Sequence, residues 1–298
     1  TRAMSDQEPA ATITRAAVLG AGTMGHGIAQ VLAMSGIETC LFDIAEDAVV
    51  DGLAKVSTNL DKGVARGKVT PEARAEAVGR LSGATDLGPA IEGAQVVVEA
   101  VPERMDLKTG IFGELGSSLG PEVVLATNTS SLSITRIADA TLHPERVVGM
   151  HFFNPVHIMK LVEVVRTEHT SDDAAQMALS LARRMGKDPI DVRDAPGFAS
   201  SRLGIAIGME AIRMVEEKVA SAEDIDKAMT LGYGFPMGPL KLTDLVGLDV
   251  RLAIAEYLSG ELGDRFTPPQ LLRDKVERGE LGKKSGTGFY DWKESSGA

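Results

Sequence analysis

The chain has 298 residues, of which 44% are hydrophobic and 24% charged, and its formal net charge is −11 at pH 7. This length allows two domains, and the composition is that of a globular protein, but the acidic charge argues against a nucleic-acid partner, because phosphate contacts need a basic surface. No stretch of about 18 apolar residues predicts a membrane span, and the polar N-terminal segment lacks the apolar core of a secretory signal, so we expect a cytoplasmic protein.

Short β-rich runs alternate with helical stretches from Ile13 to about Val192. We expect strands at residues 15–19, 38–42, 96–100, 123–127, 147–151, 161–165 and 190–192, and helices at 25–35, 45–68, 71–80, 107–119, 134–140 and 172–185. Runs that are apolar throughout, such as residues 96–98, suit strands buried on both faces of a sheet. The alternation predicts an α/β fold with a doubly wound, mostly parallel sheet of the Rossmann type.

The single cysteine, Cys40, falls in one of these strands. One cysteine excludes an intrachain disulfide and indicates no metal cluster, so we expect no bound metal. Its apolar neighbours predict a buried hydrophobic side chain rather than a nucleophile.

The strand signal stops after Asp194, and helical patterns follow. Residues 198–218 are apolar nearly all round, which predicts a helix buried on several sides, in part against another subunit. Ser221 stands three residues before Asp224, as at a helix start, and further helices are expected at 239–246, 249–259 and 268–278. We therefore expect an α/β domain at residues 1–193 and an all-helical domain at 194–298.

The glycine run VLGAGTMGHGIA, residues 18–29, lies between the first predicted strand and helix. Its positions Gly20, Gly22, Thr23, Met24 and Gly25 form the G-x-G-x-x-G turn that places a pyrophosphate at a helix N-terminus. Asp43 ends the second strand, where a carboxylate bonds a ribose 2′-hydroxyl and repels a 2′-phosphate. The pattern thus predicts NAD rather than NADP, although FAD enzymes share the fingerprint.

Two of the polar residues on predicted strands suit acid–base chemistry. His151 ends the strand at 147–151, and ligands of such sheets bind beyond the carboxyl ends of strands. Glu163 lies in an apolar strand, where a carboxylate is costly to bury without a partner. We predict that the two form a dyad with His151 as base; the alternative is a histidine satisfied at a domain interface. For His26, His143 and His169 we expect solvated positions.

A third strand end, at Thr127, leads into Asn128, Thr129, Ser130 and Ser131. These polar side chains can reach the same site. The alternative is that Ser131 or Ser133 simply caps the next helix.

Longer motifs run in order from Val18 to Trp292, among them VVVEAVPERMDLK, LATNTSSLSIT, GMHFFNPVHIMKLVEVV, PMGPLKLTDLVGLD and LGKKSGTGFYDW. With these motifs the sequence resembles the NAD-dependent 3-hydroxyacyl-CoA dehydrogenases, most nearly the 3-hydroxybutyryl-CoA subgroup. HFFNP followed by MKLVEV is far more specific than the glycine run.

The resemblance implies a role for each matching residue. It makes His151 the catalytic base, Glu163 its orienting carboxylate and Ser130 a ligand of the substrate's 3-oxygen. It places further residues along the NAD site, namely Glu103, Lys108, Asn128, Asn154 and, from the second domain, Lys284. Lys62 and Arg66 fall where the family meets the CoA phosphates, although a solvated helix face explains them equally well.

The sequence departs from the family pattern at two positions. Ser201 stands where an asparagine usually precedes the arginine after Pro-Gly-Phe, and serine offers one short hydroxyl in place of an amide. We expect Ser201 to bond the substrate or a bridging water. His157 replaces a smaller or apolar residue, and either approaches the acyl pocket or faces solvent.

The resemblance implies reversible NAD-dependent oxidation of a (3S)-3-hydroxyacyl-CoA to the 3-oxoacyl-CoA, with short acyl chains favoured, by a homodimer. Two alternatives are open: a dehydrogenase of this fold that acts on a free hydroxy acid or sugar acid, and a dinucleotide-binding protein that has lost catalysis.

Overall fold

The computed structural model describes residues 9–293. The chain divides after Ala195 into two compact units, one formed by Thr1–Ala195 and the other by Pro196–Ala298. Each unit is described by itself below. Within the described residues, no helix combines the length and the apolar character needed to cross a bilayer.

An eight-stranded sheet forms the centre of the first unit within residues 9–195, with the strand order β3-β2-β1-β4-β5-β6-β7-β8. Neighbouring strands are parallel except β6 and β7, which are antiparallel. The strands are β1 (Arg15–Leu19), β2 (Glu38–Phe42), β3 (Leu81–Ala84), β4 (Val96–Glu99), β5 (Val124–Thr127), β6 (Val147–Phe152), β7 (Leu161–Arg166) and β8 (Asp188–Arg193). The doubly wound, mostly parallel sheet expected from the sequence is confirmed.

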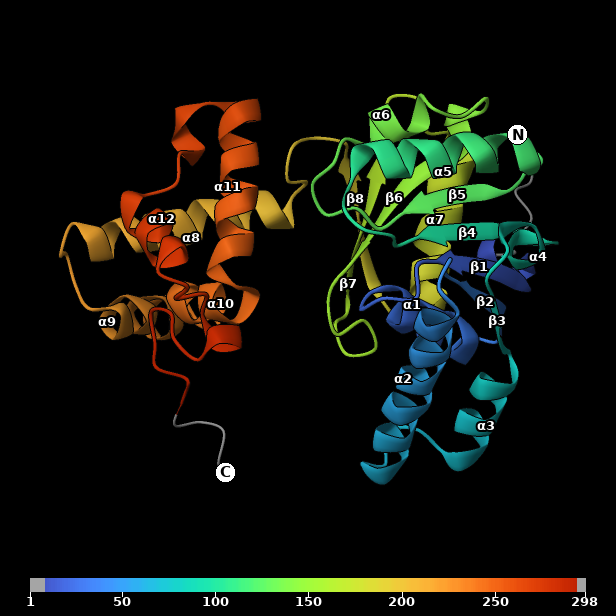
Figure 1. Cartoon of the computed structure of the whole chain (residues 1–298), viewed down its shortest axis with the longest axis horizontal. Coiled ribbons are helices and arrows are strands. Elements are labelled where there is room, and N and C mark those ends of the chain that lie inside the picture. Colours follow the sequence, from blue (N-terminus) through green and yellow to red (C-terminus); the bar gives the residue numbers. More distant parts are fainter. Residues whose placement is uncertain (1–8, 294–298) are drawn as a thin grey trace, which may run out of the picture. The chain divides into compact units, whose positions relative to one another are not determined.

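Helices cover both faces of this sheet, with α5 and α6 above the strands and α1 and α2 below them in Figure 1. The helices are α1 (Gly25–Met34), α2 (Glu46–Ala65), α3 (Pro71–Gly79), α4 (Leu87–Ile91), α5 (Met105–Ser118), α6 (Ile134–Ala138) and α7 (Asp172–Arg184), with short 3-10 turns η1 (Pro9–Thr12) and η2 (Pro144–Arg146). Helices α1 and α7 share a buried apolar cluster with one side of the strands. The alternation of strand and buried helix therefore gives the three layers.

Besides the short 3-10 turns, one strand and one α-helix of the first unit were missed in the sequence, β3 and α4, and both lie at the far edge of the sheet. Strand β3 reads Leu-Ser-Gly-Ala and pairs only with β2. Because an edge strand need not be apolar on both faces, it lacks the hydrophobic run by which the inner strands were recognised. Cys40, on the neighbouring strand, is buried as expected.

Several helices begin at a capping side chain that the sequence shows directly. The hydroxyl of Ser133 accepts the backbone N–H of Arg136 at the start of α6, so Ser133 rather than Ser131 is the cap. Ser221 likewise accepts the N–H of Asp224, as the capping pattern predicted. A hydroxyl at this position satisfies one of the N–H groups that a helix leaves unpaired.

The second unit is helical, with isolated β-bridges only near its end in the described part. Its elements are α8 (Ser200–Glu216), α9 (Ala222–Lys227), the π-helix η3 (Ala228–Gly232), α10 (Pro239–Val246), α11 (Leu248–Leu262), α12 (Gln270–Glu277), and the 3-10 turns η4 (Asp264–Phe266) and η5 (Lys283–Ser285). Helix α8 is not buried on several sides within this chain: Ile205 and Met209 are buried, whereas Leu203 is 63% exposed. Within this chain α8 packs one face into the core and leaves the other uncovered, and the expected burial of that face against another subunit stays a prediction.

Candidate active site

The glycine run forms the tight turn between β1 and α1. Gly20 has a φ of +99°, and a Cβ there would lie 2.7 Å from the carbonyl oxygen of Ala100. A Cβ on Gly25 would lie 1.6 Å from the carbonyl oxygen of Gly20, so only glycine lets the helix start so close to the strand. At Gly22 a Cβ would meet nothing within 4 Å, so the backbone there faces open space. This is the geometry that a pyrophosphate needs at the start of α1.

A cavity of about 740 Å³ opens beside this turn, at the carboxyl ends of β1, β2 and β4. Gly20, Gly22, Thr23, Met24 and Asp43 line it, as expected for cofactor-binding residues. Its remaining lining is mostly apolar and includes residues that sequence reasoning missed, namely Ile44, Leu87, Val101, Pro102, Leu107 and Ile111. The position of Val101 and Pro102 directly after a buried strand is the signal that would have found them.

Asp43 connects the end of β2 to the glycine turn. Its carboxylate accepts the backbone N–H of Ala21 at 2.9 Å and that of Ala45 at 3.2 Å. These bonds fix the carboxylate at the cavity wall, where it can accept a ribose hydroxyl and would repel a phosphate in its place.

His151 and Glu163 lie opposite each other on the antiparallel pair β6 and β7. Nδ1 of His151 lies 2.7 Å from Oε2 of Glu163, and the exposed fractions of the two residues are 6% and 0%. An ionised carboxylate can only accept, so it holds the proton on Nδ1 and leaves the lone pair on Nε2. The predicted dyad is therefore formed, and the ring also packs 4.6 Å from Phe153, centroid to centroid.

The loop after β5 carries Asn128 and Ser130 beside the dyad strand. Oδ1 of Asn128 accepts the backbone N–H of Phe152 at 2.9 Å, which ties this loop to the end of β6. The carboxylate of Glu103 accepts the N–H of Ser130 at 2.9 Å and the hydroxyl of Thr129 at 2.6 Å. Glu103 thus contacts the loop that carries Ser130, and its role along the NAD site stays a prediction.

The charge state of Glu103 follows from these contacts. Burial acts to raise the pKa of Glu103, but the Lys108 ammonium and the hydrogen bonds from Thr129 and Ser130 outweigh it. The pKa consequently lies below its ordinary value, and the group is an acceptor at neutral pH. Lys108 itself is 1% exposed, with Nζ 2.6 Å from Glu99 and 3.4 Å from Glu103.

The other predicted site residues lie outside the strand pair that carries the dyad. Lys62 and Arg66 are exposed at the end of α2, and Asn154 is exposed before Pro155. Ser201 and Lys284 belong to the second unit. Ser201 lies half-buried in the first turn of α8, and Nζ of Lys284 is 2.6 Å from the carboxylate of Asp249.

The remaining histidines differ in their surroundings. His143 and His169 are partly exposed beside acidic side chains. His26 is half-buried and its Nδ1 lies 2.8 Å from the carbonyl oxygen of Gly22, so it braces the glycine turn instead of being merely solvated. The His157 side chain is exposed, and its pKa is lowered by partial burial, by Lys187 and by His26, which favours a neutral ring.

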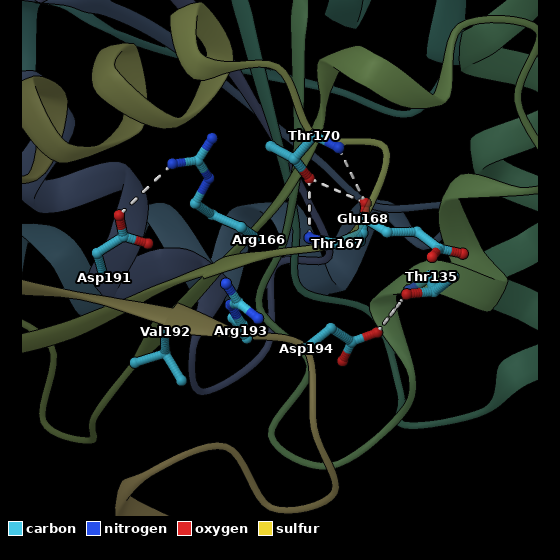
Figure 2. A pocket seen from close by; sticks show the side chains of 9 residues that line it. All are labelled: Thr135, Arg166, Thr167, Glu168, Thr170, Asp191, Val192, Arg193 and Asp194. Carbon is cyan, nitrogen blue, oxygen red and sulfur yellow. Dashed lines mark hydrogen bonds and ion pairs between the residues drawn. The ribbon is translucent and has the colours of Figure 1, made fainter.

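A second cavity, of about 850 Å³, lies where β7 and β8 end (Figure 2). In its lining Arg166 faces Asp191, and Asp194 accepts the hydroxyl of Thr135. His151 lies near the C-terminal end of β6. Because β7 runs antiparallel to β6, the C-terminal end of β7 lies at the opposite end of these two strands. This cavity holds none of the predicted site residues.

Comparison with known proteins agrees with this geometry. Residues 15–195 match the model of the 3-hydroxyacyl-CoA dehydrogenase NAD-binding domain, and residues 197–292 match that of the family's C-terminal domain. The chain is 45% identical to a probable 3-hydroxybutyryl-CoA dehydrogenase of Bacillus subtilis, over 94% of this chain and 97% of that protein. It is 44% identical to a 3-hydroxybutyryl-CoA dehydrogenase of Mycobacterium tuberculosis, over 94% and 99%.

A solved structure adds the fold. The crystal structure of (S)-3-hydroxybutyryl-CoA dehydrogenase PaaH1 from Ralstonia eutropha superposes with a TM-score of 0.91 at 40% identity, covering 94% of this chain and 99% of that one. The sequence matches, the fold and the geometry of the site agree with one another. The chain belongs to the 3-hydroxyacyl-CoA dehydrogenase family and is an NAD-dependent oxidoreductase.

Proposed function

We propose that the protein oxidises short-chain (3S)-3-hydroxyacyl-CoA thioesters, 3-hydroxybutyryl-CoA among them, reversibly to 3-oxoacyl-CoA. The observation that carries the proposal is the 2.7 Å contact between His151 Nδ1 and Glu163 Oε2, on the sheet whose glycine turn and cavity suit NAD. Bound NAD would supply the acceptor for the hydride that leaves C3.

His151 is the base in this reaction. Nε2 takes the proton of the substrate's 3-hydroxyl, and Glu163 stabilises the imidazolium that forms. Because the carboxylate is fully buried, it does not need to reorganise when the charge appears, and the low local dielectric strengthens the interaction. In the reverse direction the same nitrogen returns the proton to the oxygen.

Ser130 fixes the oxygen between base and cofactor. The N–H and hydroxyl of Ser130 both face Glu103, at 2.9 and 3.3 Å, so the loop is held before substrate arrives. Ser201 is the second candidate for this oxygen, on the helical unit. When the substrate oxygen is fixed, the proton and the hydride can leave from a single arrangement of base, substrate and cofactor. This lowers the entropic part of the activation barrier. For NAD, the roles of Glu103, Lys108, Asn128, Asn154 and Lys284 are proposed on the family pattern alone, as are those of Lys62 and Arg66 for CoA.

A substrate panel tests the proposal. NADH formation is measured with (S)- and (R)-3-hydroxyacyl-CoA of increasing chain length, with thioesters ending in a carboxylate, and with the free 3-hydroxy acids. We expect turnover of the short (S)-thioesters and not of the free acids. Equal turnover of the free acid would instead support a hydroxy-acid dehydrogenase. NAD binding without turnover of any thioester would mean that catalysis has been lost.

We also propose that the protein is a homodimer joined through its helical unit. Leu203 and Ile207 share one face of α8, and Leu242, Leu245 and Val246 share one face of α10; all five are at least 37% exposed. Apolar side chains repeated on the faces of two packed helices are typical of a protein interface.

Light scattering of the eluted protein tests this assembly. The wild type is expected to have twice the mass of the chain, and Leu203→Glu with Leu245→Glu to have the mass of one. Leu142→Glu is the matched control, because Leu142 is 75% exposed on the first unit and its variant is expected to remain a dimer. A monomeric wild type, or a double variant of unchanged mass, would rule out this interface.

A further inference from the structure

The loop at residues 153–160 joins the two strands of the dyad, β6 and β7. His151 lies before this loop and Glu163 after it, and the two are paired in the register of these antiparallel strands. The register of such a pair depends on the geometry of the connection, and a slip by one residue would turn a side chain to the opposite face of the sheet. The conformation of the loop therefore bears directly on whether His151 meets Glu163.

The ammonium group of Lys187 holds this loop from the side of β8. Lys187 directly precedes β8 and is 9% exposed. Its Nζ donates to the carbonyl oxygen of Met159 at 2.9 Å and to that of Val156. Burial and the neighbouring Lys160 lower the pKa of Lys187, so the surroundings work against its charge. Because burying an ammonium group is costly, stability alone is a weak reason for a lysine at this position.

Gly27 provides the second contact of the loop, on α1. It follows the G-x-G-x-x-G positions and lies in the first turn of this helix, where the fingerprint does not require glycine. A Cβ on Gly27 would lie 2.8 Å from Cβ of Val156 and 2.9 Å from its Cγ2. Val156 is 3% exposed and belongs to the same apolar cluster as Ile28 of α1. Since glycine weakens a helix, the close approach of the loop is the reason for its presence here.

The two contacts meet at one residue of the loop. The side chain of Val156 lies against Gly27, and its carbonyl oxygen accepts from Lys187. Within the loop, the carbonyl oxygen of Pro155 accepts the N–H of Met159 at 3.0 Å. The loop is therefore a closed turn that is held between the start of β8 and the helix that begins at the glycine turn.

We propose that Lys187 and Gly27 are positioning residues: they dock the 153–160 loop onto α1 and so fix His151 relative to the NAD bound at the start of that helix. Each acts through the loop, not on the reacting atoms. Proton and hydride leave neighbouring atoms of the substrate, so base and cofactor must keep a fixed separation. The inference rests on the proposed function, because it takes His151 to be the base.

Lys187→Met removes the donors and keeps an unbranched side chain of similar length. With 3-hydroxybutyryl-CoA we expect kcat per NAD-binding site to fall about 10- to 100-fold, since a misplacement of about 1 Å can cost this much. Calorimetry gives the number of NAD-binding sites and the Kd for NAD, which is expected to stay within about threefold of wild type. Lys160→Met is the matched control, because it removes a charge from the same loop but only a 3.4 Å contact with the carbonyl oxygen of Gly186. Its kcat is expected to equal that of the wild type.

Gly27→Ala disturbs the loop from the side of the helix. The added Cβ displaces Val156, and we expect kcat to fall about 10-fold. Combined with Lys187→Met, the same change is expected to cost less than it does alone, because both variants release one loop. Gly260→Ala is the matched control, since a Cβ at this exposed helical position would meet nothing within 4 Å, and its kcat is expected to be unchanged.

Hydrogen exchange separates positioning from a general loss of stability. The peptide covering residues 155–160 is expected to exchange faster in Lys187→Met than in the wild type, because two of its carbonyl groups lose their donor. A merely structural lysine would instead lower the midpoint of thermal unfolding or the number of NAD-binding sites. Both kcat per site and the exchange of this peptide would then stay at the wild-type values, which would overturn the proposal.

Other results would also contradict it. A raised KM with unchanged kcat would mean that Lys187 binds the substrate, and a large loss of NAD affinity with kcat restored at saturating NAD would mean that it acts on the cofactor. An equal loss of kcat in Lys160→Met would make the charge responsible, not the two hydrogen bonds. A wild type without thioester turnover would defeat the proposed function, and the exchange measurement would still decide whether Lys187 orders the loop.

Discussion

His151→Gln is expected to lower kcat by about 10²- to 10⁴-fold, the usual contribution of a positioned general base, while the Kd for NAD stays unchanged. Glutamine has a similar reach but takes up no proton at neutral pH. The loss should appear equally in oxidation and reduction, because the same nitrogen removes and returns the proton. Rate assays at saturating substrate measure kcat, and calorimetry measures NAD binding.

His143→Gln is the matched control for this variant. His143 is a partly exposed histidine whose Nδ1 lies 3.0 Å from Glu145, so it reproduces the imidazole–carboxylate contact away from the site. Its variant is expected to turn over like the wild type. If His151→Gln kept kcat within about twofold of wild type, His151 would not be the base.

Glu163→Gln is expected to reduce kcat by about 10²- to 10⁴-fold, because an amide neither fixes the Nδ1–H tautomer nor stabilises the imidazolium. The midpoint of thermal unfolding is measured alongside, so that a loss of fold is distinguished from a loss of chemistry.

The corresponding control is Glu145→Gln, which alters the exposed partner of His143. We expect the kcat of this variant to match the wild type. A Glu163→Gln enzyme with a wild-type kcat would show that His151 works without the buried carboxylate, and the dyad mechanism would have to be abandoned.

Local sequence patterns determined most of the fold. Glycine at 20 and 25 is required where a Cβ would collide with the backbone, and Ser221 caps α9 because its hydroxyl reaches an N–H three residues on. The inner strands are mostly apolar because helices cover both faces. Patterns of this kind depend on neighbours in the chain, so the sequence shows them. The edge strand β3 has no such constraint and was missed.

Only the tertiary structure decided which polar groups meet. His151 and Glu163 were predicted to pair from their types and positions, but the contact depends on the register of two antiparallel strands. The sequence did not predict that Glu99 is buried in an ion pair. A carboxylate at the end of an apolar strand gives the same sequence pattern whether its side chain faces solvent or contacts Lys108. The buried ammonium of Lys108 meets the carboxylates of Glu99 and Glu103 and the carbonyl oxygen of Val101, which the sequence could not show. The sequence specifies the type of each side chain. Its hydrogen-bond partners depend on how distant strands pack, because a hydrogen bond requires atoms within about 3 Å.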